Sequence, residues 1–415
     1  MPLTHSPAEL SAWLRFSLEP GLTPALRYPL LSTLGLPEHI YSLGASALAK
    51  VVPQALAIQL AASTPPEVQE QIDRTLQWVD QPGHTILTLA DAGYPQNLLT
   101  IADPPLLLYV NGDPGYLSRP ALAVVGARNA TPGGCENARA FAQYLAGEGW
   151  CVVSGLAQGV DAAAHEGALQ AGSQGAGTVA IMGTGIDDRV YPARHRDLAH
   201  RIAERGALVS ELPLGMGALP HHFPARNRLV AGLARGVLVV EAARQSGSLI
   251  TARLAGESGR EVFAIPGSIH SPLSRGCHAL IRQGAKLVET AQDITDELGG
   301  TRRSADSGRP AASTRGRARG QTKAVARSSQ SPATSDEEAA PPPDHIDTDA
   351  SDPSDPSDPS DTPLLRALGY DPLHLDVLQE RTGQDIPTLT AQLLELELAG
   401  HIARLEGGRF QRLKS

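Results

Sequence analysis

The sequence has 415 residues, of which 41% are hydrophobic and 19% charged, so it can build an α/β core and two smaller domains. Its three cysteines lack Cys-x-x-Cys spacing, which argues against a disulfide framework or a zinc site and favours a reducing compartment. Neither a signal-peptide pattern nor an apolar run long enough for a bilayer occurs. We therefore expect a cytoplasmic protein without a membrane span.

The formal charge of −9 at first argues against a nucleic-acid partner, because proteins that bind phosphates are usually basic. Much of the acid, however, lies in residues 336–361, which contain ten carboxylates and neither Lys nor Arg. The rest of the chain is close to neutral, and its arginines are concentrated near glycine-rich turns. Net charge therefore does not exclude a nucleic-acid partner.

Residues 1–80 are rich in Ala and Leu with helical spacing, for example at Leu10, Trp13 and Leu14. They predict a small helical domain similar to helix-hairpin-helix or SAM-like modules. Its basic residues are few and scattered, so we favour a structural or partner-contacting role over direct DNA contact. A short unit around residues 93–109, with a strand of its own, follows and is expected to complete the edge of a sheet.

Residues 81–298 predict the main domain. An apolar run begins at Ala121, stops at Gly126 and gives way to Pro132-Gly133-Gly134, which is typical of a buried strand, a tight turn and a helix. The same alternation repeats, with strands near residues 151–154, 178–182, 208–210, 237–241 and 262–265. Because helical segments separate these strands, we expect an α/β domain with a doubly wound, mostly parallel sheet and helices on both faces.

Residues 299–361 change composition abruptly. Eight basic residues and one acid lie between residues 301 and 327, and an acidic, proline-rich tract with three Ser-Asp-Pro triplets follows. Neither half can bury enough apolar surface to offset its ordering entropy. This segment is therefore predicted to be a disordered linker.

Residues 362–415 show three helical periods and then two short strands turned by Gly407-Gly408, which describes a winged helix. A winged helix that reads DNA presents Arg, Lys, Asn or Gln on its third helix. The third helical segment, residues 386–400, has no Lys or Arg and contains Glu395 and Glu397. For this domain we therefore favour a protein contact over DNA reading.

Glycine-rich turns follow several strands of the main domain, and the carboxyl ends of parallel strands meet at one edge of a sheet. Backbone N–H groups at the starts of the next helices would then face an anion, helped by the helix dipoles. Arginines neutralise phosphate and an aromatic ring accepts any base, which together favour sequence-tolerant single-strand binding. The candidate DNA-binding residues are Gly126, Ala127, Arg128, Asn129, Gly155, Gly159, Gly183, Gly185, Phe223, Arg226, Asn227, Arg228, Ser246, Gly247 and Ser248.

Patterns for catalysis or cofactor binding do not occur. The sequence has no Gly-x-Gly-x-x-Gly fingerprint, P-loop or Gly-x-Ser-x-Gly elbow, so we expect no cofactor, no metal and no catalytic residue. Asp161 and His165 lie four residues apart on one helical face. We expect Asp161 to cap that helix and His165 to satisfy a polar contact in the core. His221 and His222 lack metal-ligand spacing and are expected beside the groove.

These residues, in this order, closely resemble the DNA processing protein A family (DprA, also called Smf). The motifs that carry the resemblance are Gly126-Ala-Arg128, Ser154-Gly155-Leu-Ala-x-Gly159-Val-Asp161, Gly183-x-Gly185, Tyr191-Pro192, Phe223-Pro-x-Arg226-Asn227-Arg228 and Ser246-Gly247-Ser248. The resemblance implies a Rossmann-like protein that binds single-stranded DNA (ssDNA) without catalysis and acts as a homodimer. It also implies that the protein protects incoming single strands during natural transformation and loads RecA onto them.

By motif position, the resemblance assigns a phosphate to Arg128. The chain departs from the family at Ala127, which replaces a serine, and at Leu219, where many members carry Lys or Arg. The missing phosphate contact could come from His221 or from the segment after Tyr191-Pro192, which contains Arg194 and Arg196. That segment fits a basic rim and a solvated helix face equally well.

Two other functions stay open at this point. One is a nucleotide-processing enzyme similar to the Rossmann-like phosphoribohydrolases, whose Pro-Gly-Gly-x-Gly-Thr loop corresponds here to the turn from Ser246 to Leu249. The other is a protein–protein adaptor, which would require that Arg128 be irrelevant to DNA.

Overall fold

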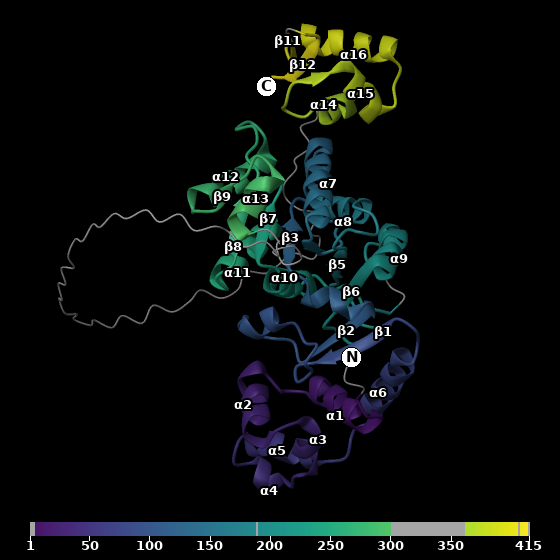
Figure 1. The fold of residues 1–415 in the computed structure, drawn as a ribbon, viewed down its shortest axis with the longest axis vertical. Coiled ribbons are helices and arrows are strands. Elements are labelled where there is room, and N and C mark those ends of the chain that lie inside the picture. Colours follow the sequence, from purple (N-terminus) through teal and green to yellow (C-terminus); the bar gives the residue numbers. More distant parts are fainter. Residues whose placement is uncertain (1–4, 188–189, 300–361, 406, 414–415) are drawn as a thin grey trace, which may run out of the picture.

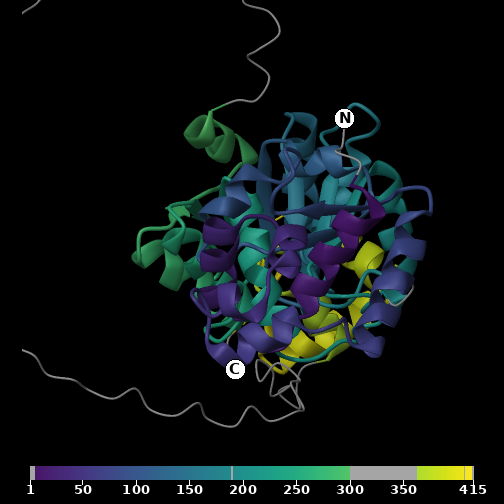
Figure 2. The same ribbon diagram turned by 90° about the horizontal axis from the view of Figure 1, so that it is seen from below.

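Three bodies follow one another along the long axis of the molecule in the computed structural model, which describes residues 5–187, 190–299, 362–405 and 407–413 (Figure 1). The helical domain and the winged helix lie at opposite ends, with the sheet domain between them. Seen from below, the N-terminal helices lie in front of the sheet domain and the winged helix lies behind it (Figure 2). The linker predicted at residues 299–361 lies, apart from residue 299, outside the described residues.

Six short helices build the N-terminal body, and four of them begin at a proline. Proline is favoured in the first turn because its fixed φ suits a helix and its missing N–H would have no partner there. Trp13, Leu14 and Phe16 of the first helix are almost completely buried at its centre. The helices are α1 (Pro7–Leu18), α2 (Pro24–Leu34), α3 (Pro37–Ser42), α4 (Ala45–Leu48), α5 (Gln54–Ala61) and α6 (Pro66–Val79).

A nine-stranded sheet forms the middle body, in the order β1-β2-β6-β5-β4-β3-β7-β8-β9. All pairs from β6 to β9 are parallel, whereas β2 pairs antiparallel with both β1 and β6. The doubly wound, mostly parallel sheet is therefore confirmed. The strands are β1 (His84–Thr88), β2 (Leu107–Gly112), β3 (Ala121–Val125), β4 (Cys151–Ser154), β5 (Thr178–Ile181), β6 (Gly206–Ser210), β7 (Gly236–Val239), β8 (Glu261–Ala264) and β9 (Lys286–Leu287).

Helices cover both faces of this sheet because alternate strand residues point to opposite sides. On β3, Leu122 and Val124 pack with α7, α8 and α13, while Ala123 and Val125 face the side of α10, α11 and α12. The helices are α7 (Pro132–Gly147), α8 (Val160–Gln170), α9 (Arg196–Arg205), α10 (His222–Leu233), α11 (Gly247–Glu257), α12 (Arg275–Arg282) and α13 (Ala291–Leu298). Short 3-10 turns lie at η1 (Gln96–Thr100), η2 (Pro114–Ser118), η3 (Ala193–His195) and η4 (Pro272–Ser274).

The winding direction of the chain reverses between β3 and β7. From β3 it proceeds through β4 and β5 to β6 in one direction, and then it returns to β7 on the other side of β3 and continues to β8 and β9. In open α/β sheets, ligands bind beyond the carboxyl ends of the strands at such a point, because neighbouring turns diverge there. The fold therefore places a crevice next to the turn that contains Arg128.

The C-terminal body is a winged helix, as the sequence predicts, with a short additional strand before its second helix. Its elements are α14 (Pro363–Leu368), β10 (Leu373–His374), α15 (Leu375–Thr382), α16 (Ile386–Leu398), β11 (Ile402–Leu405) and β12 (Arg409–Arg412). It contacts the sheet domain at the start of α7, where Arg381 donates to both carboxylate oxygens of Glu136, at 3.3 Å from Nε and 2.9 Å from Nη2. Among the described helices, none is both long and apolar enough to span a bilayer.

Candidate nucleic-acid interface

A pocket of about 220 Å³ opens where the winding of the sheet reverses. Its walls come from the turns after β3, β4 and β7 and from the first turns of α10 and α11. The lining residues are Val125, Gly126, Arg128, Ala157, Asp161, Phe223, Pro224, Arg226, Asn227, Ser246, Gly247, Ser248, Ile250 and Thr251. Segments that lie far apart in the sequence thus meet at one edge of the sheet.

The turn that carries Arg128 is fixed by backbone hydrogen bonds. The Ala127 N–H donates to the Glu241 carbonyl at 2.8 Å, and the Ala127 carbonyl accepts from the Val160 N–H at 3.2 Å. Ala127 is itself buried, whereas Arg128 is exposed. The guanidinium carbon of Arg128 lies 5.8 Å from the centre of the Phe223 ring. The turn is therefore held in place, and it puts the Arg128 cation beside the Phe223 ring at the pocket.

The N-terminus of α11 forms the opposite wall. Ser246 is its N-cap and accepts a hydrogen bond from the Ser248 N–H at 3.4 Å. The two hydroxyl oxygens lie 2.8 Å apart, and Gly247 between them is exposed. The dipole of this helix adds to the charge of Arg128, and both favour an anion in the pocket.

Arg226 has a different position from the one expected for a groove arginine. It is 6% exposed, and its Nη1 donates to the carbonyl oxygens of Gly155, at 2.5 Å, and of Ile181. Burial lowers the pKa of Arg226, against the opposing effect of Asp161. The guanidinium occupies the space that a β-carbon on Gly155 would take, so only glycine fits there. Arg226 thus joins the ends of β4 and β5 from inside the pocket wall.

The Asp161 carboxylate is also committed to the protein itself. It accepts from the N–H groups of Gly155, at 3.1 Å, and Ala157, at 3.3 Å, instead of capping its own helix as the sequence suggested. Burial raises the pKa of Asp161, and the charge of Arg226 opposes this shift. In the turn after β4, the N–H groups of Gly155 and Ala157 therefore face the protein's own carboxylate.

His165 satisfies a polar contact in the core, as expected. Its Nδ1 lies 2.7 Å from the Thr178 hydroxyl, which itself donates to the Val152 carbonyl, so the histidine Nδ1–H is the donor. Burial lowers the pKa of His165 to about 3, and the ring is therefore neutral at physiological pH. His165 is therefore not free to act as an acid or base toward a ligand, and two backbone N–H groups already hold the Asp161 carboxylate.

A second aromatic ring, which was not among the candidate residues, lies next to Phe223 of the pocket. Phe223 packs against Gly183, where a β-carbon would lie 2.9 Å from the phenyl ring. On its other side, the Tyr191 ring is centred 5.4 Å away and tilted by 48°. Tyr191 precedes a cis peptide bond to Pro192. The sequence drew attention to this dipeptide but gave no sign that its ring meets Phe223.

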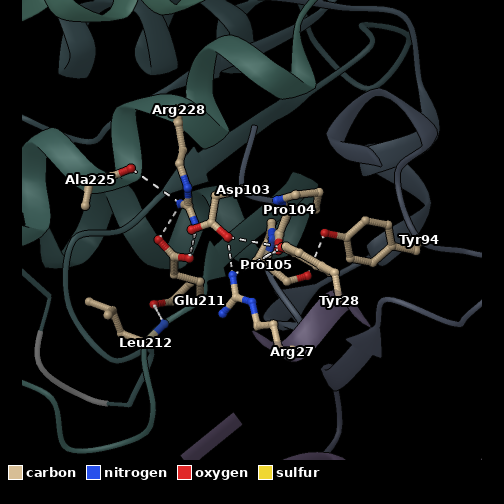
Figure 3. A network of polar contacts seen from close by, with 11 residues as sticks. Arg27, Tyr28, Tyr94, Asp103, Pro104, Pro105, Glu211, Leu212, Ala225 and Arg228 are labelled. Carbon is tan, nitrogen blue, oxygen red and sulfur yellow. Dashed lines mark hydrogen bonds and ion pairs between the residues drawn. The ribbon is translucent and has the colours of Figure 1, made fainter. Parts of the chain in front are cut away.

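Arg228 lies in a network of polar contacts with Glu211 and Asp103 (Figure 3) and does not line the pocket. Its two terminal nitrogens bind both oxygens of Glu211, at 2.7 Å and 2.5 Å, and Nη2 lies 3.5 Å from Asp103. Asp103 in turn accepts from Arg27 of α2. Burial opposes the charge of Arg228, but hydrogen bonds and charges from Glu211 raise its pKa overall. The structure therefore places Arg228 at the junction with the helical domain, which corrects its expected place in the groove.

Eight of the candidate residues line the pocket: Gly126, Arg128, Phe223, Arg226, Asn227, Ser246, Gly247 and Ser248. The others do not line it: Ala127, Asn129, Gly155, Gly159, Gly183, Gly185 and Arg228. Among these, Gly159 has a φ of 78°, and its backbone lies so close to the carbonyls of Ala127 and Arg128 that a β-carbon would clash with them. Gly159 therefore shapes the backbone and does not contact a ligand in the pocket. Asn129 is exposed beside the pocket and accepts from Gln158 at 3.3 Å.

Leu219, which stands where the resemblance predicted Lys or Arg, is exposed and retains 43% of its accessible surface. The alternative residues His221, Arg194 and Arg196 are exposed as well. All three side chains are therefore accessible to a phosphate.

Glu241 is a residue that sequence reasoning did not single out. Its carboxylate accepts from the N–H of Thr131 at 2.9 Å and from its hydroxyl at 2.6 Å, at the N-terminus of α7. Burial raises the pKa of Glu241, and the hydrogen bonds from Thr131 oppose the shift. The Glu241 carboxylate thus occupies the N-terminus of α7, the helix that follows β3. In dinucleotide-binding folds, the corresponding helix N-terminus holds pyrophosphate. The sequence signal that could have drawn attention to Glu241 is an acidic residue directly after a buried strand.

Within the described residues, no cluster of His, Cys, Asp or Glu has the arrangement of a metal site. The fold and the pocket together define a Rossmann-like α/β protein with an arginine and aromatic rings at the switch point of its sheet. Residues 85–299 match the protein family described as DNA recombination-mediator protein A, and residues 348–408 match the DprA winged helix domain. The chain belongs to this DprA family, which confirms the resemblance noted in the motifs.

Individual relatives support the same assignment. Protein Smf of Escherichia coli is 40% identical over 82% of this chain and 80% of its own length. DNA processing protein DprA of Streptococcus pneumoniae is 47% identical over 51% of this chain and 73% of its own length. The X-ray structure of DNA processing protein A from Streptococcus pneumoniae superposes with a TM-score of 0.59 at 37% identity, covering 71% of this chain and 99% of that one.

Proposed function

We propose that this protein is a non-catalytic DNA recombination mediator that binds single-stranded DNA without strong sequence preference. In the cytoplasm it protects incoming single strands during natural transformation and loads RecA recombinase onto them. Membership of the DprA family and the names of the relatives support a role in DNA processing. The RecA and transformation parts of the proposal rest on the family resemblance.

One observation carries the DNA-binding part: exposed Arg128 lies beside Phe223 and opposite the N-terminus of α11. A guanidinium and a helix dipole attract phosphate, and every base has a π-face that an aromatic ring accepts. Gly126, Asn227, Ser246, Gly247 and Ser248 line the same pocket and complete the proposed contact surface. Attraction of phosphate and stacking on an aromatic face do not depend on which base is present, so these contacts favour sequence tolerance.

The same geometry supports a non-catalytic role. A nucleotide-processing enzyme needs an acid or base that can reach the ligand. Asp161 is bound by two backbone N–H groups, and His165 is buried against Thr178. Incubation with nucleoside monophosphates is therefore expected to release no free base, and release of a base would favour the enzyme.

Self-association completes the proposal. The protein is expected to act as a homodimer that uses the later half of the sheet domain. There, β9 is the last strand of the sheet, and Leu287 on it is 49% exposed. A groove of about 670 Å³ between α11 and α12 includes Ala285, two residues earlier. An open sheet edge with exposed apolar side chains is a surface on which a second chain can dock.

The first test compares the intact protein with Arg128→Ala by fluorescence anisotropy, using a mixed-sequence oligonucleotide at two salt concentrations. Loss of a charged hydrogen bond is expected to weaken binding by about 1.5–3 kcal/mol. The logarithm of the intact affinity should fall with the logarithm of salt by about 0.7 per neutralised phosphate, and the variant should have the shallower slope. Arg139→Ala is the matched control, since Arg139 pairs with Glu166 on the α7 and α8 side of the sheet. Equal binding by all three proteins would show that the pocket does not hold DNA.

A further inference from the structure

We propose that Tyr191 is a second base-stacking position, so that the path of single-stranded DNA continues from the Arg128 pocket over Phe223 and onto Tyr191. This inference rests on the proposed ssDNA function and adds a residue and a direction to it.

Tyr191 has the exposure that a stacking platform requires. It keeps 55% of its accessible surface, more than any other aromatic side chain that the structure describes. Among the described residues, its hydroxyl makes no hydrogen bond. Exposed Tyr144 on α7, by contrast, is bound through its hydroxyl to Gln292. An aromatic ring in contact with solvent costs free energy unless a ligand covers it.

The geometry extends an arrangement that already exists in the pocket. The guanidinium carbon of Arg128 lies 5.8 Å from the Phe223 ring centre, and that centre lies 5.4 Å from the Tyr191 ring centre. The rings are tilted by 48° to each other, so they offer differently oriented faces. Two bases that are splayed apart can each stack on one ring, which is how aromatic side chains hold successive bases of a single strand.

The segment around Tyr191 is fixed to the pocket and carries positive charge. His195 Nδ1 lies 2.9 Å from the carbonyl oxygen of Leu156, in the turn after β4. This contact holds η3 next to a wall of the pocket. Arg194 and Arg196 on either side of His195 are exposed and can follow the phosphates of a strand that stacks on Tyr191. Charge and stacking surface thus continue in the same direction, toward α9.

A length series tests the proposal. Anisotropy titrations would use oligothymidines from about 4 to 16 nucleotides, the range of site sizes of single-strand binding folds. For the intact protein, affinity should rise once the oligonucleotide is long enough to reach Tyr191. Tyr191→Ala should bind the shortest oligonucleotides like the intact protein and the longer ones roughly 5- to 150-fold more weakly, the loss of one stacked base. Tyr191→Phe should retain the affinity at every length, because the ring is kept.

Controls separate this proposal from the one on which it rests. Tyr144→Ala removes an exposed tyrosine on α7 and should change nothing. If Tyr191→Ala binds every length like the intact protein while Arg128→Ala weakens all of them, the stacking role is wrong and the pocket stands. If Arg128→Ala also binds like the intact protein, the pocket does not hold DNA and the DNA-binding site proposed above fails with it.

A second readout does not depend on the stability of the alanine variant. Tyr191→Trp places a fluorophore at the proposed position, and its emission should be quenched when a long oligothymidine binds. Unchanged emission at saturating oligonucleotide would overturn the proposal.

Discussion

Two arginines at the same pocket have different tasks. Arg128 is exposed above Phe223, whereas Arg226 is buried and binds two backbone carbonyls. Each residue stands in a short motif that the sequence marked for DNA contact, Gly126-Ala-Arg128 and Phe223-Pro-Ala-Arg226, and neither motif signals which arginine is buried. The difference arises because Gly155 leaves room for a guanidinium to approach the backbone, which is a property of tertiary packing.

Arg226→Ala should therefore change stability more than it changes recognition. The substitution leaves the buried Asp161 carboxylate without its cation and the carbonyls of Gly155 and Ile181 without that donor. Breaking a buried charge pair in this way typically costs about 3–5 kcal/mol. Urea unfolding should show a loss of this size, while Arg128→Ala should change the free energy of unfolding by less than about 0.5 kcal/mol. An Arg226→Ala protein that unfolds like the intact one but loses DNA would instead make Arg226 a direct ligand.

At the scale of elements, α10 serves three surfaces at once. Its first turn places Phe223 at the pocket, the next position on the same face places Arg226 in the wall, and Arg228 points to the helical domain. There, Arg228 and Arg27 share Asp103 between them, and Glu211 binds Arg228 through both oxygens. The helix thus connects the pocket to the N-terminal body.

Arg228→Ala tests this division of α10. The half-buried carboxylates of Glu211 and Asp103 would lose a cation, so unfolding should become easier by about 1–3 kcal/mol. The affinity for ssDNA should stay within twofold of the intact value, because Arg228 does not line the pocket. Urea unfolding and anisotropy on the same preparation provide both readouts. A large loss of affinity in a variant with intact stability would return Arg228 to the groove.

Long apolar runs made most elements predictable. The strands β3 to β8 lie within two residues of their predicted positions, since β3 to β7 are continuous buried runs between turn residues and β8 ends in two buried residues. The short strands β9 and β10, of two residues each, have no such pattern and exist because a neighbouring strand offers hydrogen bonds. β1 likewise depends on its register with β2, in which His84 pairs with Asn111. For the same reason, contacts between distant side chains, such as Tyr191 with Phe223, could not be predicted.

For the whole molecule, the proposed dimer makes a prediction at β9. Leu287→Glu places a charge on the exposed apolar edge, where burial against a second copy would cost several kcal/mol. The intact protein should elute as a dimer in size-exclusion chromatography with light scattering, and the variant as a monomer. Exposed Leu36 lies on the helical domain, so Leu36→Glu is the control and should remain dimeric. A dimeric Leu287→Glu protein would place the interface elsewhere.

The two ends of the sheet differ in a way that limits how large an assembly can grow. At one end, α6 lies over β1: Trp78 stacks on His84 with ring centres 4.2 Å apart, and His84 Nδ1 lies 2.9 Å from the Trp78 carbonyl. At the other end, β9 has no outer strand within the described residues. In the proposed dimer, two copies that join through β9 about a twofold axis would cover each other's β9 edge, so that edge would not remain for a third copy. Long single strands would then be coated by separate pairs placed side by side, each able to dissociate without unravelling a filament.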